Sequence, residues 1–169
     1  MDKVRIVVSD PELITGQVRG IEPTMEELIS ESKFEIRLLA YLVTSGGAEL
    51  LDIIEKAAKR GITVIIVINN LENQTKLVTE RIKLLVSSNH NLKVYNFNGT
   101  IDSIQLHAKV LTADGERALV GSANITKSGM YRNYEIGVLI ESERVKDLNS
   151  IIDTIIKKSK EITWPFDTL

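Results

Sequence analysis

The chain has 169 residues, a formal charge of −2 from 21 Lys and Arg against 23 Asp and Glu, and a hydrophobic fraction of 43%. This balance is that of an ordinary globular protein, and the length suits one well-buried core better than two. With no Cys and only two His, disulfides, thiolate zinc sites, cysteine nucleophiles and a His-rich metal cage within one chain are excluded. The pI near 5.8 counts against an obligate nucleic-acid coat protein, but a local basic groove can sit on an acidic body.

The distribution of apolar and polar residues along the chain indicates the expected location of the protein in the cell and its number of domains. No stretch reaches the ~20 apolar residues of a membrane span, and residues 1–10 lack the long apolar core of a signal peptide. We therefore expect a cytoplasmic protein without stable membrane association. No linker composition, low-complexity run or internal repeat divides the sequence, so we expect a single domain over residues 1–169, with its core at residues 24–156.

The first hundred residues alternate between two apolar patterns. Continuous or alternating apolar runs predict strands, whereas apolar residues three and four apart predict helices. In chain order these are a strand at 4–8, a helix of about ten residues after Thr24, a strand at 34–45, a helix ending at Arg60, a strand at 62–70, a helix at 76–88 and a strand at 92–97. Thr24 with Glu27 resembles a capping box, and Gly61 is a natural C-cap. Strand, helix and strand in this order predict a βαβ unit.

After residue 100 the pattern changes. Residues 105–124 contain two apolar strands around Asp114-Gly115, which favours a hairpin turn. A strand at 133–142 follows, and then a closing helix. The expected inner face of that helix consists of Leu148, Ile151, Ile152, Ile155 and Ile156. The sequence does not settle whether residues 164–166, within the tail Trp164-Leu169, fold back as a plug. The fold class is therefore α/β, a single domain with a central mixed, largely parallel sheet flanked by helices.

Polar side chains gather in the hairpin region. His107 and Lys109 are two apart on a predicted strand, so both leave the same face, and Ser122 and Asn124 have the same spacing beyond the turn. Together they supply a nucleophile or base and three hydrogen-bonding groups that suit a tetrahedral anion. Glu135, on the following strand, is placed to accept a hydrogen bond from an imidazole N–H and so fix its tautomer.

Plainer interpretations exist for several of these residues. A lone His on a strand is more often structural, but the matched spacing of its neighbours favours a site. Ser122 and Asn124 could instead cap a turn. For Asp114 and Gly121 a structural role in the turn and the backbone is the better interpretation.

Two cationic side chains outside this group are weaker candidates. Lys127 and Arg132 follow the hairpin and are possible substrate-binding residues, although such a pair is usually solvated surface. His90 is interpreted as a solvated loop residue.

These residues fit a known pattern. The motif H-x-K-x4-D-x6-G-S-x-N is present as His107, Lys109, Asp114, Gly121, Ser122 and Asn124. It resembles the signature of the phospholipase D superfamily, the HKD phosphodiesterases, which is a specific signal because six positions are fixed. Upstream, a strand ending near Tyr41, a helix ending in AAKRG and the run ITVIIVI also resemble the family. Glu135 lies where its single-motif bacterial endonucleases place the acid that orients the histidine.

The chain departs from the larger family members, which carry two HKD motifs. His90 does not begin a second motif, because Lys93 follows three residues later instead of two and no G-S-x-N follows. Smaller members resolve this by homodimerising, so that two motifs meet across a two-fold axis. The resemblance therefore implies a homodimer.

The resemblance also implies a mechanism that needs no metal and no cofactor. His107 attacks phosphorus to form a phosphohistidine, and the partner's His107 protonates the leaving oxygen. Lys109 and Asn124 of both protomers hold the non-bridging oxygens. Ser122 positions the phosphate or the opposite side chain, and Glu135 orients His107.

The substrate stays open at this stage. Small size and a single motif favour a metal-independent nuclease that hydrolyses DNA or RNA. A phospholipase D-type lipid phosphodiesterase would need exposed apolar loops, and the visible loops are mostly polar apart from Met130 and Tyr131. The third alternative is a DNA-recognition or nuclease-like subunit of a larger restriction, repair or defence assembly. The sequence distinguishes neither DNA from RNA nor single from double strands.

Overall fold

The protein is described by a computed structural model, which covers residues 2–99 and 104–163. The strands are β1 Lys3–Val8, β2 Arg19–Gly20, β3 Glu35–Ala40, β4 Thr63–Asn69, β5 Leu92–Phe97, β6 Val110–Ala113, β7 Arg117–Gly121, β8 Ile136–Glu141 and β9 Lys160–Ile162. The α-helices are α1 Ile21–Glu31, α2 Ala48–Lys59, α3 Lys76–Ser88, α4 Lys127–Tyr131 and α5 Val145–Ile156. Short 3₁₀ turns are η1 Pro11–Leu13, η2 Ser45–Gly47 and η3 Leu71–Asn73.

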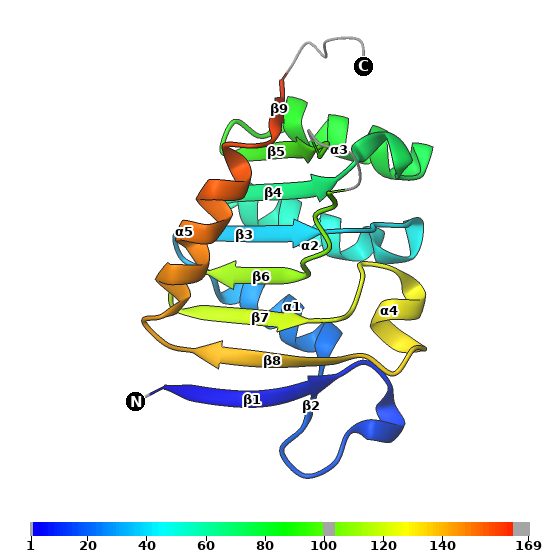
Figure 1. The fold of residues 1–169 in the computed structure, drawn as a ribbon, viewed down its shortest axis with the longest axis vertical. Coiled ribbons are helices and arrows are strands. Elements are labelled where there is room, and N and C mark those ends of the chain that lie inside the picture. Colours follow the sequence, from blue (N-terminus) through cyan, green and yellow to red (C-terminus); the bar gives the residue numbers. More distant parts are fainter. Residues whose placement is uncertain (1, 100–103, 164–169) are drawn as a thin grey trace.

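The strands of the described residues form one mixed sheet in the order β2-β1-β8-β7-β6-β3-β4-β5-β9 (Figure 1). β3, β4 and β5 are parallel neighbours, whereas β6, β7 and β8 pair antiparallel. The predicted α/β class with a mixed sheet flanked by helices is confirmed. Its parallel part is smaller than expected, because β6, β7 and β8 follow one another as antiparallel neighbours and need no crossover helix.

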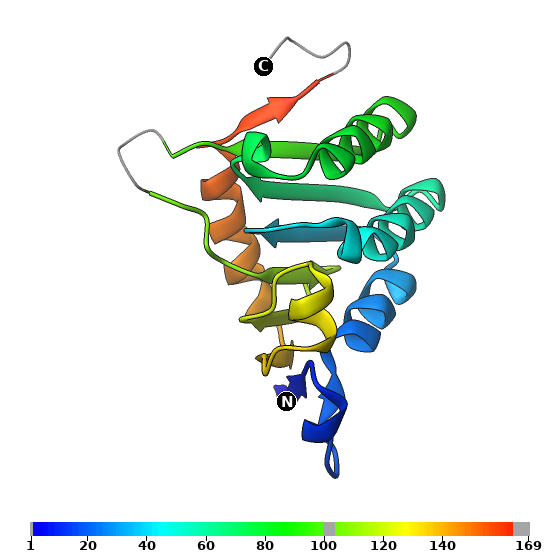
Figure 2. The same ribbon diagram turned by 90° about the vertical axis from the view of Figure 1, so that its right-hand side faces the viewer.

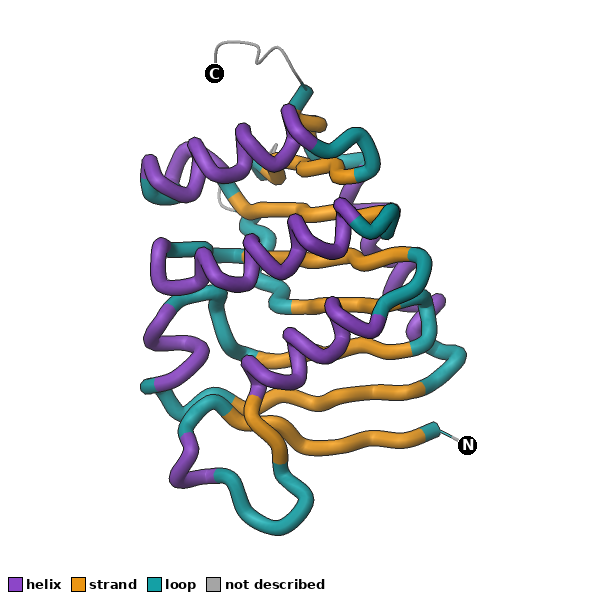
Figure 3. Tube along the Cα trace, turned by 180° about the vertical axis from the view of Figure 1, so that it is seen from behind, coloured by secondary structure: helices purple, strands orange, loops and turns teal. Residues whose placement is uncertain are grey.

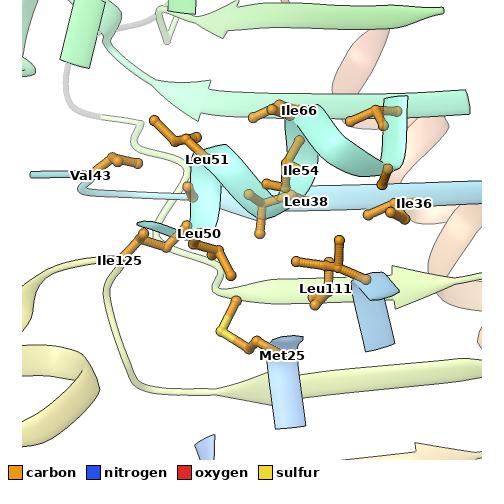
Figure 4. Packing of buried hydrophobic residues seen from close by; sticks show 14 of the residues in the cluster. Met25, Ile36, Leu38, Val43, Leu50, Leu51, Ile54, Ile66, Leu111 and Ile125 are labelled. Atoms are coloured by element: carbon orange, nitrogen blue, oxygen red, sulfur yellow. The ribbon is translucent and has the colours of Figure 1, made fainter. Parts of the chain in front are cut away.

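Helices cover the two faces of the sheet unequally. Figure 3 shows α1, α2 and α3 side by side across one face, and Figure 2 shows α5 on the opposite face. A smaller buried cluster, including Leu39, Val67 and Ile152, lies on the α5 side. The larger cluster lies under the other three helices, and Figure 4 shows Ile54 and Ile66 within it. Each fully buried aliphatic side chain of this kind contributes about 1.5–3 kcal/mol, so the strand ends project from a firmly packed layer.

Several helix predictions are confirmed. α3 occupies residues 76–88, and α2 ends just before Gly61, whose backbone is left-handed (φ 93°), as expected of a terminating glycine. α5 buries Ile152, but Ile151 is 57% exposed, because adjacent helical residues point about 100° apart. The considered plug at residues 164–166 lies outside the described residues.

The first helix begins earlier than the capping-box prediction, which is wrong. α1 starts directly after Gly20, and Thr24 lies inside it, fully buried, with its hydroxyl donating to the Gly20 carbonyl oxygen at 2.7 Å. Glu27 instead forms an ion pair with Arg19 of β2. Pro23 is compatible with this start, because the first turn of a helix leaves its N–H groups without helical acceptors.

The apolar run at residues 34–45 does not form one long strand. β3 stops well before its end, and the chain turns out of the ladder at Tyr41. It then runs beside the loop after β7, where the Ile125 N–H donates to the Leu42 carbonyl oxygen at 3.1 Å and the Thr44 N–H donates to the Ile125 carbonyl oxygen at 3.0 Å. Contacts to a distant loop thus replace the expected strand pairing.

Strand ends from both halves of the sheet, including the end of β1, gather at one edge. β3, β4, β5 and β7 end at the right-hand edge of Figure 1, where β6 and β8 begin. The loops that leave these ends are therefore brought close to one another. We call this edge the motif edge, because it carries residues 107–109 and 122–124.

Asp114 lies at the other end of the hairpin. It and Gly115 have left-handed backbone (φ 57° and 68°), as a tight Asp-Gly turn requires. Its carboxylate accepts hydrogen bonds from the backbone N–H groups of Phe34 (2.8 Å), Glu35 (3.0 Å) and Lys33 (2.9 Å). Burial raises the pKa of Asp114, but these bonds outweigh that effect and hold the pKa below its ordinary value.

We expect Asp114→Asn to lower the free energy of unfolding by about 1–2 kcal/mol at neutral pH, because an amide accepts weaker hydrogen bonds than a carboxylate. Since the folded-state pKa is depressed, the stabilisation is present above the ordinary carboxyl pKa of about 4 and is lost as the pH falls through the folded value. Urea unfolding curves of the two proteins should therefore converge at acid pH. The control Asp147→Asn, at an exposed carboxylate of α5, should change stability by less than about 0.5 kcal/mol; equal losses would contradict the structural role.

Candidate active site

The candidate side chains lie in loops at the motif edge. They are His107 and Lys109 before β6, Ser122 and Asn124 after β7, and Glu135 before β8. The expectation that His107 and Lys109 belong to a strand is wrong, because β6 begins at Val110. Even so, the Gly121 N–H donates to the Lys109 carbonyl oxygen at 3.2 Å. This bond extends the hairpin pairing and keeps the two halves of the motif side by side.

His107 and Lys109 contact each other directly. The Lys109 Nζ lies 3.0 Å from Nδ1 and 3.2 Å from Nε2 of the imidazole, and it donates to the His107 carbonyl oxygen at 2.8 Å. His107 is exposed, whereas Lys109 is half-buried. An anion that approaches the imidazole therefore also meets an ammonium group.

Tyr41 packs against both of these side chains. Its ring centroid lies 4.4 Å from that of His107, with the planes tilted by 55°, and the Lys109 Nζ is 5.1 Å from the Tyr41 centroid. Ring contacts of this kind orient an exposed imidazole, and a cation–π attraction contributes about 0.5–1 kcal/mol. Tyr41 was not among the site residues predicted from the sequence. The one feature of the sequence that could have pointed to it is an aromatic residue near the end of a predicted buried strand.

Glu135 binds Ser122 and not His107. The Ser122 hydroxyl donates to Glu135 Oε2, and the Asn133 Nδ2 donates to Oε1 at 3.2 Å. The Glu135 N–H donates to the Ser9 hydroxyl oxygen at 3.0 Å. Among the described residues, no hydrogen bond joins the carboxylate to His107, so the expected orienting contact is not formed within this chain. Ser9 and Asn133 were missed, because nothing in the local sequence brings the end of β1 to this loop.

Asn124 lies in a closely packed turn. A Cβ at Gly129 would lie 2.4 Å from the Asn124 carbonyl oxygen, so the turn requires glycine there. Asn124, Lys109 and Tyr41 line a cavity of about 20 Å³ beneath the site. The Asn124 Oδ1 is buried and has no hydrogen-bond partner within the part of the chain that the structure describes. Its amide therefore caps no turn.

The charges of Lys109 and Glu135 influence each other. Burial lowers the pKa of the Lys109 ammonium from its ordinary value, and the negative charge of Glu135 opposes that change. The pair formed by Ser122 and Glu135 is thus coupled electrostatically to the pair formed by His107 and Lys109. Imidazole, ammonium, hydroxyl and carboxylate form one connected group.

The two weaker candidates flank α4 at the same edge (Figure 1). Lys127 begins α4 and Arg132 follows it, and both are exposed. The Thr126 hydroxyl caps the helix by accepting the Gly129 N–H at 2.9 Å. A Cβ at Gly46 would lie 2.6 Å from the Lys127 Cβ, so η2 packs directly against the start of α4. A role for these cations in substrate binding stays a prediction.

The two apolar residues noted in this loop do not form an exposed patch together. Met130 is buried, and Tyr131 donates its hydroxyl hydrogen to the Glu22 carboxylate. Across residues 2–99 and 104–163, none of the helices has the length and hydropathy to cross a membrane. The same residues include no cluster of three or more His, Asp or Glu side chains arranged to hold a metal ion.

Solved structures share this arrangement. The chain superposes on a phospholipase D family member, Nuc from Salmonella typhimurium, with a TM-score of 0.79 and 21% identity, covering 96% of this chain and 99% of that one. For NucT from Helicobacter pylori the TM-score is 0.75 at 18% identity, with 95% and 99% covered. These likenesses define the fold as that of the phospholipase D-like proteins.

Sequence relatives agree with the fold. The chain is 27% identical over 95% of its length to the DISARM protein DrmC of Bacillus paralicheniformis, and 31% identical over 66% of its length to cardiolipin synthase A of Yersinia pestis. It spans 67% of the first relative and 22% of the second. Residues 25–158 match the family model described as cardiolipin synthase, PLD-like domain. The chain belongs to this family, which confirms the predicted membership of the phospholipase D superfamily and its phosphodiesterase-type fold.

Removing the charge of Glu135 tests the electrostatic coupling in the site. Because that charge raises the pKa of Lys109, Glu135→Gln is expected to lower the pKa further, so the ammonium loses its proton at a lower pH. A side-chain NMR titration of Lys109 measures this directly. Glu143→Gln, an exposed carboxylate remote from the motif edge, is the control and should leave the titration unchanged. An unchanged Lys109 in the Glu135 variant would disprove the coupling.

Proposed function

We propose that the chain is a metal-independent nuclease that hydrolyses DNA or RNA through a phosphohistidine, in a site shared by two protomers. The observation that carries the proposal is the exposed imidazole of His107 beside the half-buried ammonium of Lys109, with a hydroxyl, an amide and a carboxylate on the same edge. This set offers a nucleophile and a cation for a phosphodiester without a further cofactor.

The proposed chemistry proceeds in two steps. His107 attacks phosphorus, a P–N bond forms as the P–O bond to the leaving group breaks, and the partner's His107 donates a proton to the leaving oxygen. Water then attacks phosphorus, with the partner's His107 as base, and the P–N bond breaks. Lys109 and Asn124 stabilise the non-bridging oxygens. Ser122, held by Glu135, positions the phosphate.

An exposed apolar strip supports the second protomer. Val4, Ile6 and Ile136 are 62%, 46% and 61% exposed. Val8 pairs with Ile136, and alternate residues of a strand share a face, so these side chains lie on one side of β1 and β8. Contiguous exposed apolar surface marks interaction sites. The strip reaches the motif edge next to Glu135. A second copy of the chain bound there would contribute the second histidine that the proposed mechanism requires.

The similarity to a DISARM protein over nearly the whole chain favours a second candidate function. In that proposal the chain is a nuclease-like subunit of a larger assembly, whose other components supply affinity for DNA. The acidic composition is compatible with such a division of roles.

The enzyme proposal is tested with plasmid DNA, single-stranded DNA, RNA and phosphatidylcholine vesicles, each with excess EDTA. Wild-type protein is expected to cleave nucleic acid at an unchanged rate in the chelator. His107→Ala should abolish cleavage, and Lys109→Ala should slow it by about two orders of magnitude or more. His90→Ala replaces the other, exposed histidine and should retain full activity. Activity that EDTA abolishes and Mg²⁺ restores, or cleavage of the vesicles alone, would refute the assignment.

Subunit mixing tests the shared site. After exchange, an equal mixture of wild-type and His107→Ala chains should keep about a quarter of the activity of the same total of wild type, because only dimers with two intact chains work. If one intact histidine per dimer suffices, the mixture should keep about half of the activity of the same total of wild type. Light scattering on the same samples establishes the oligomeric state, and a fully active monomer would rule out the proton donor assigned to the partner.

A further inference from the structure

A cavity of about 550 Å³ opens at the motif edge beside the candidate active site. It lies beyond the ends of β3, β4 and β5, where ligands bind in many open α/β sheets. Gln105, one of its lining residues, accepts the His107 N–H through its carbonyl oxygen at 3.1 Å. The wall of the cavity therefore continues directly into the segment that carries the nucleophile.

Tyr41 lies next to both this cavity and the candidate side chains. Its ring centroid is 4.4 Å from that of His107, and the residue is also one of those that line the cavity. A phosphodiester at His107 thus has the cavity one side chain away, so a group attached to the neighbouring sugar is the part of the substrate that reaches it.

Buried amides build a fixed inner wall. The Asn69 Oδ1 accepts the Leu106 N–H at 2.8 Å, and the Gln74 amide accepts the Val43 N–H at 2.9 Å and donates to the Asn69 carbonyl oxygen at 2.9 Å. Phe97 adds an almost buried aromatic ring. The Asn69 and Gln74 amides already have hydrogen-bond partners, so they shape the cavity wall and are not available to bind a ligand.

Other amides at the cavity have no partner among the described residues. The side chains of Asn73, Asn98 and Gln105 are exposed and make no hydrogen bonds to other described residues. Asn70 has left-handed backbone (φ 43°). Its N–H donates to the Phe97 carbonyl oxygen at 2.9 Å, which joins the loop after β4 to the end of β5. Asn is one of the few residues other than Gly that adopt this conformation readily. Each free amide offers both donors and an acceptor.

The charge of the cavity excludes a second phosphate as its ligand. Among the described residues that line it, Glu72 is the single charged side chain, and it is an anion. Lys109, Lys127 and Arg132, which are cations of this edge, do not line it. The ligand that fits is therefore an uncharged planar group with hydrogen-bond donors and acceptors, which describes a nucleobase. Amide side chains pair with base edges, and aromatic rings stack on base faces.

We propose that this cavity binds the base of the nucleotide next to the scissile phosphate, which makes an unpaired strand the preferred substrate. A base in a duplex is stacked and paired, so it must leave the helix to enter a pocket. The inference rests on the proposed nuclease function and adds to it the strand state of the substrate and the residues that read it.

The test starts from a single-stranded oligonucleotide that the wild-type protein cuts. A set of oligonucleotides of the same sequence is made, each with one abasic residue at a different position. Loss of the base next to a scissile bond is expected to slow cleavage there by about tenfold, the effect of removing one stacked base. The same strand annealed to its complement should also be cut more slowly. Asn73→Ala with Asn98→Ala should slow cleavage of the intact strand but not of the abasic bond. Gln17→Ala, an exposed amide far from the cavity, is the matched control.

The outcomes separate the two proposals. Equal cleavage beside normal and abasic residues, equal rates on single strands and duplex, or equal losses by the double variant on intact and abasic strands would overturn the base pocket and leave the nuclease standing. Wild-type protein that cuts phosphatidylcholine vesicles and no oligonucleotide would overturn both. Circular dichroism of the double variant establishes that it is folded.

Discussion

The antiparallel pairing of β6 with β3 on one side and β7 on the other is the constraint on which the site depends. It places residues 107–109 beside residues 122–124, and the bond between the Lys109 carbonyl and the Gly121 N–H extends that pairing to the motif itself. The turn at the far end is fastened by the Asp114 carboxylate to the start of β3. The arrangement of the candidate site at one end of the hairpin therefore relies on hydrogen bonds to the backbone at the other.

Polar groups at the motif edge fall into two classes with different physical roles. Buried amides such as Gln74 and Asn69 satisfy backbone groups that leave the sheet, and their removal would expose unpaired donors. The exposed imidazole of His107 contacts the Lys109 ammonium and the Tyr41 ring, and the amides of Asn73, Asn98 and Gln105 have no hydrogen-bond partner among the described residues. Since the fold does not require their polar groups, ligand chemistry is the simplest reason for them. The separation of cations around His107 from neutral amides around the cavity matches the separation of phosphate and base within a nucleotide.

Much of this was predictable from the sequence. The helix at 76–88 and the strand at 62–70 follow from local apolar patterns, a helical spacing in the first and a continuous run in the second, and the motif spacing identified the hairpin next to His107. Contacts between distant segments were not predictable. Tyr41 was assigned to a long strand because residues 34–45 are largely apolar, whereas the chain leaves the sheet there to meet Ile125. Local patterns also placed the start of α1 at Thr24, since they cannot show that its hydroxyl is buried against Gly20.

Tyr41 gives the molecule a property that neither neighbouring site has alone. Its ring lies against the imidazole of His107 and the ammonium of Lys109, and the same residue lines the neighbouring cavity. In the proposed nuclease, a base that fills the cavity would contact the residue that packs against the nucleophile. Binding energy gained there would be available to the transition state and not only to the ground state. Affinity and turnover would then be linked through one aromatic residue, so a poor fit in the cavity would reduce kcat as well as raise KM.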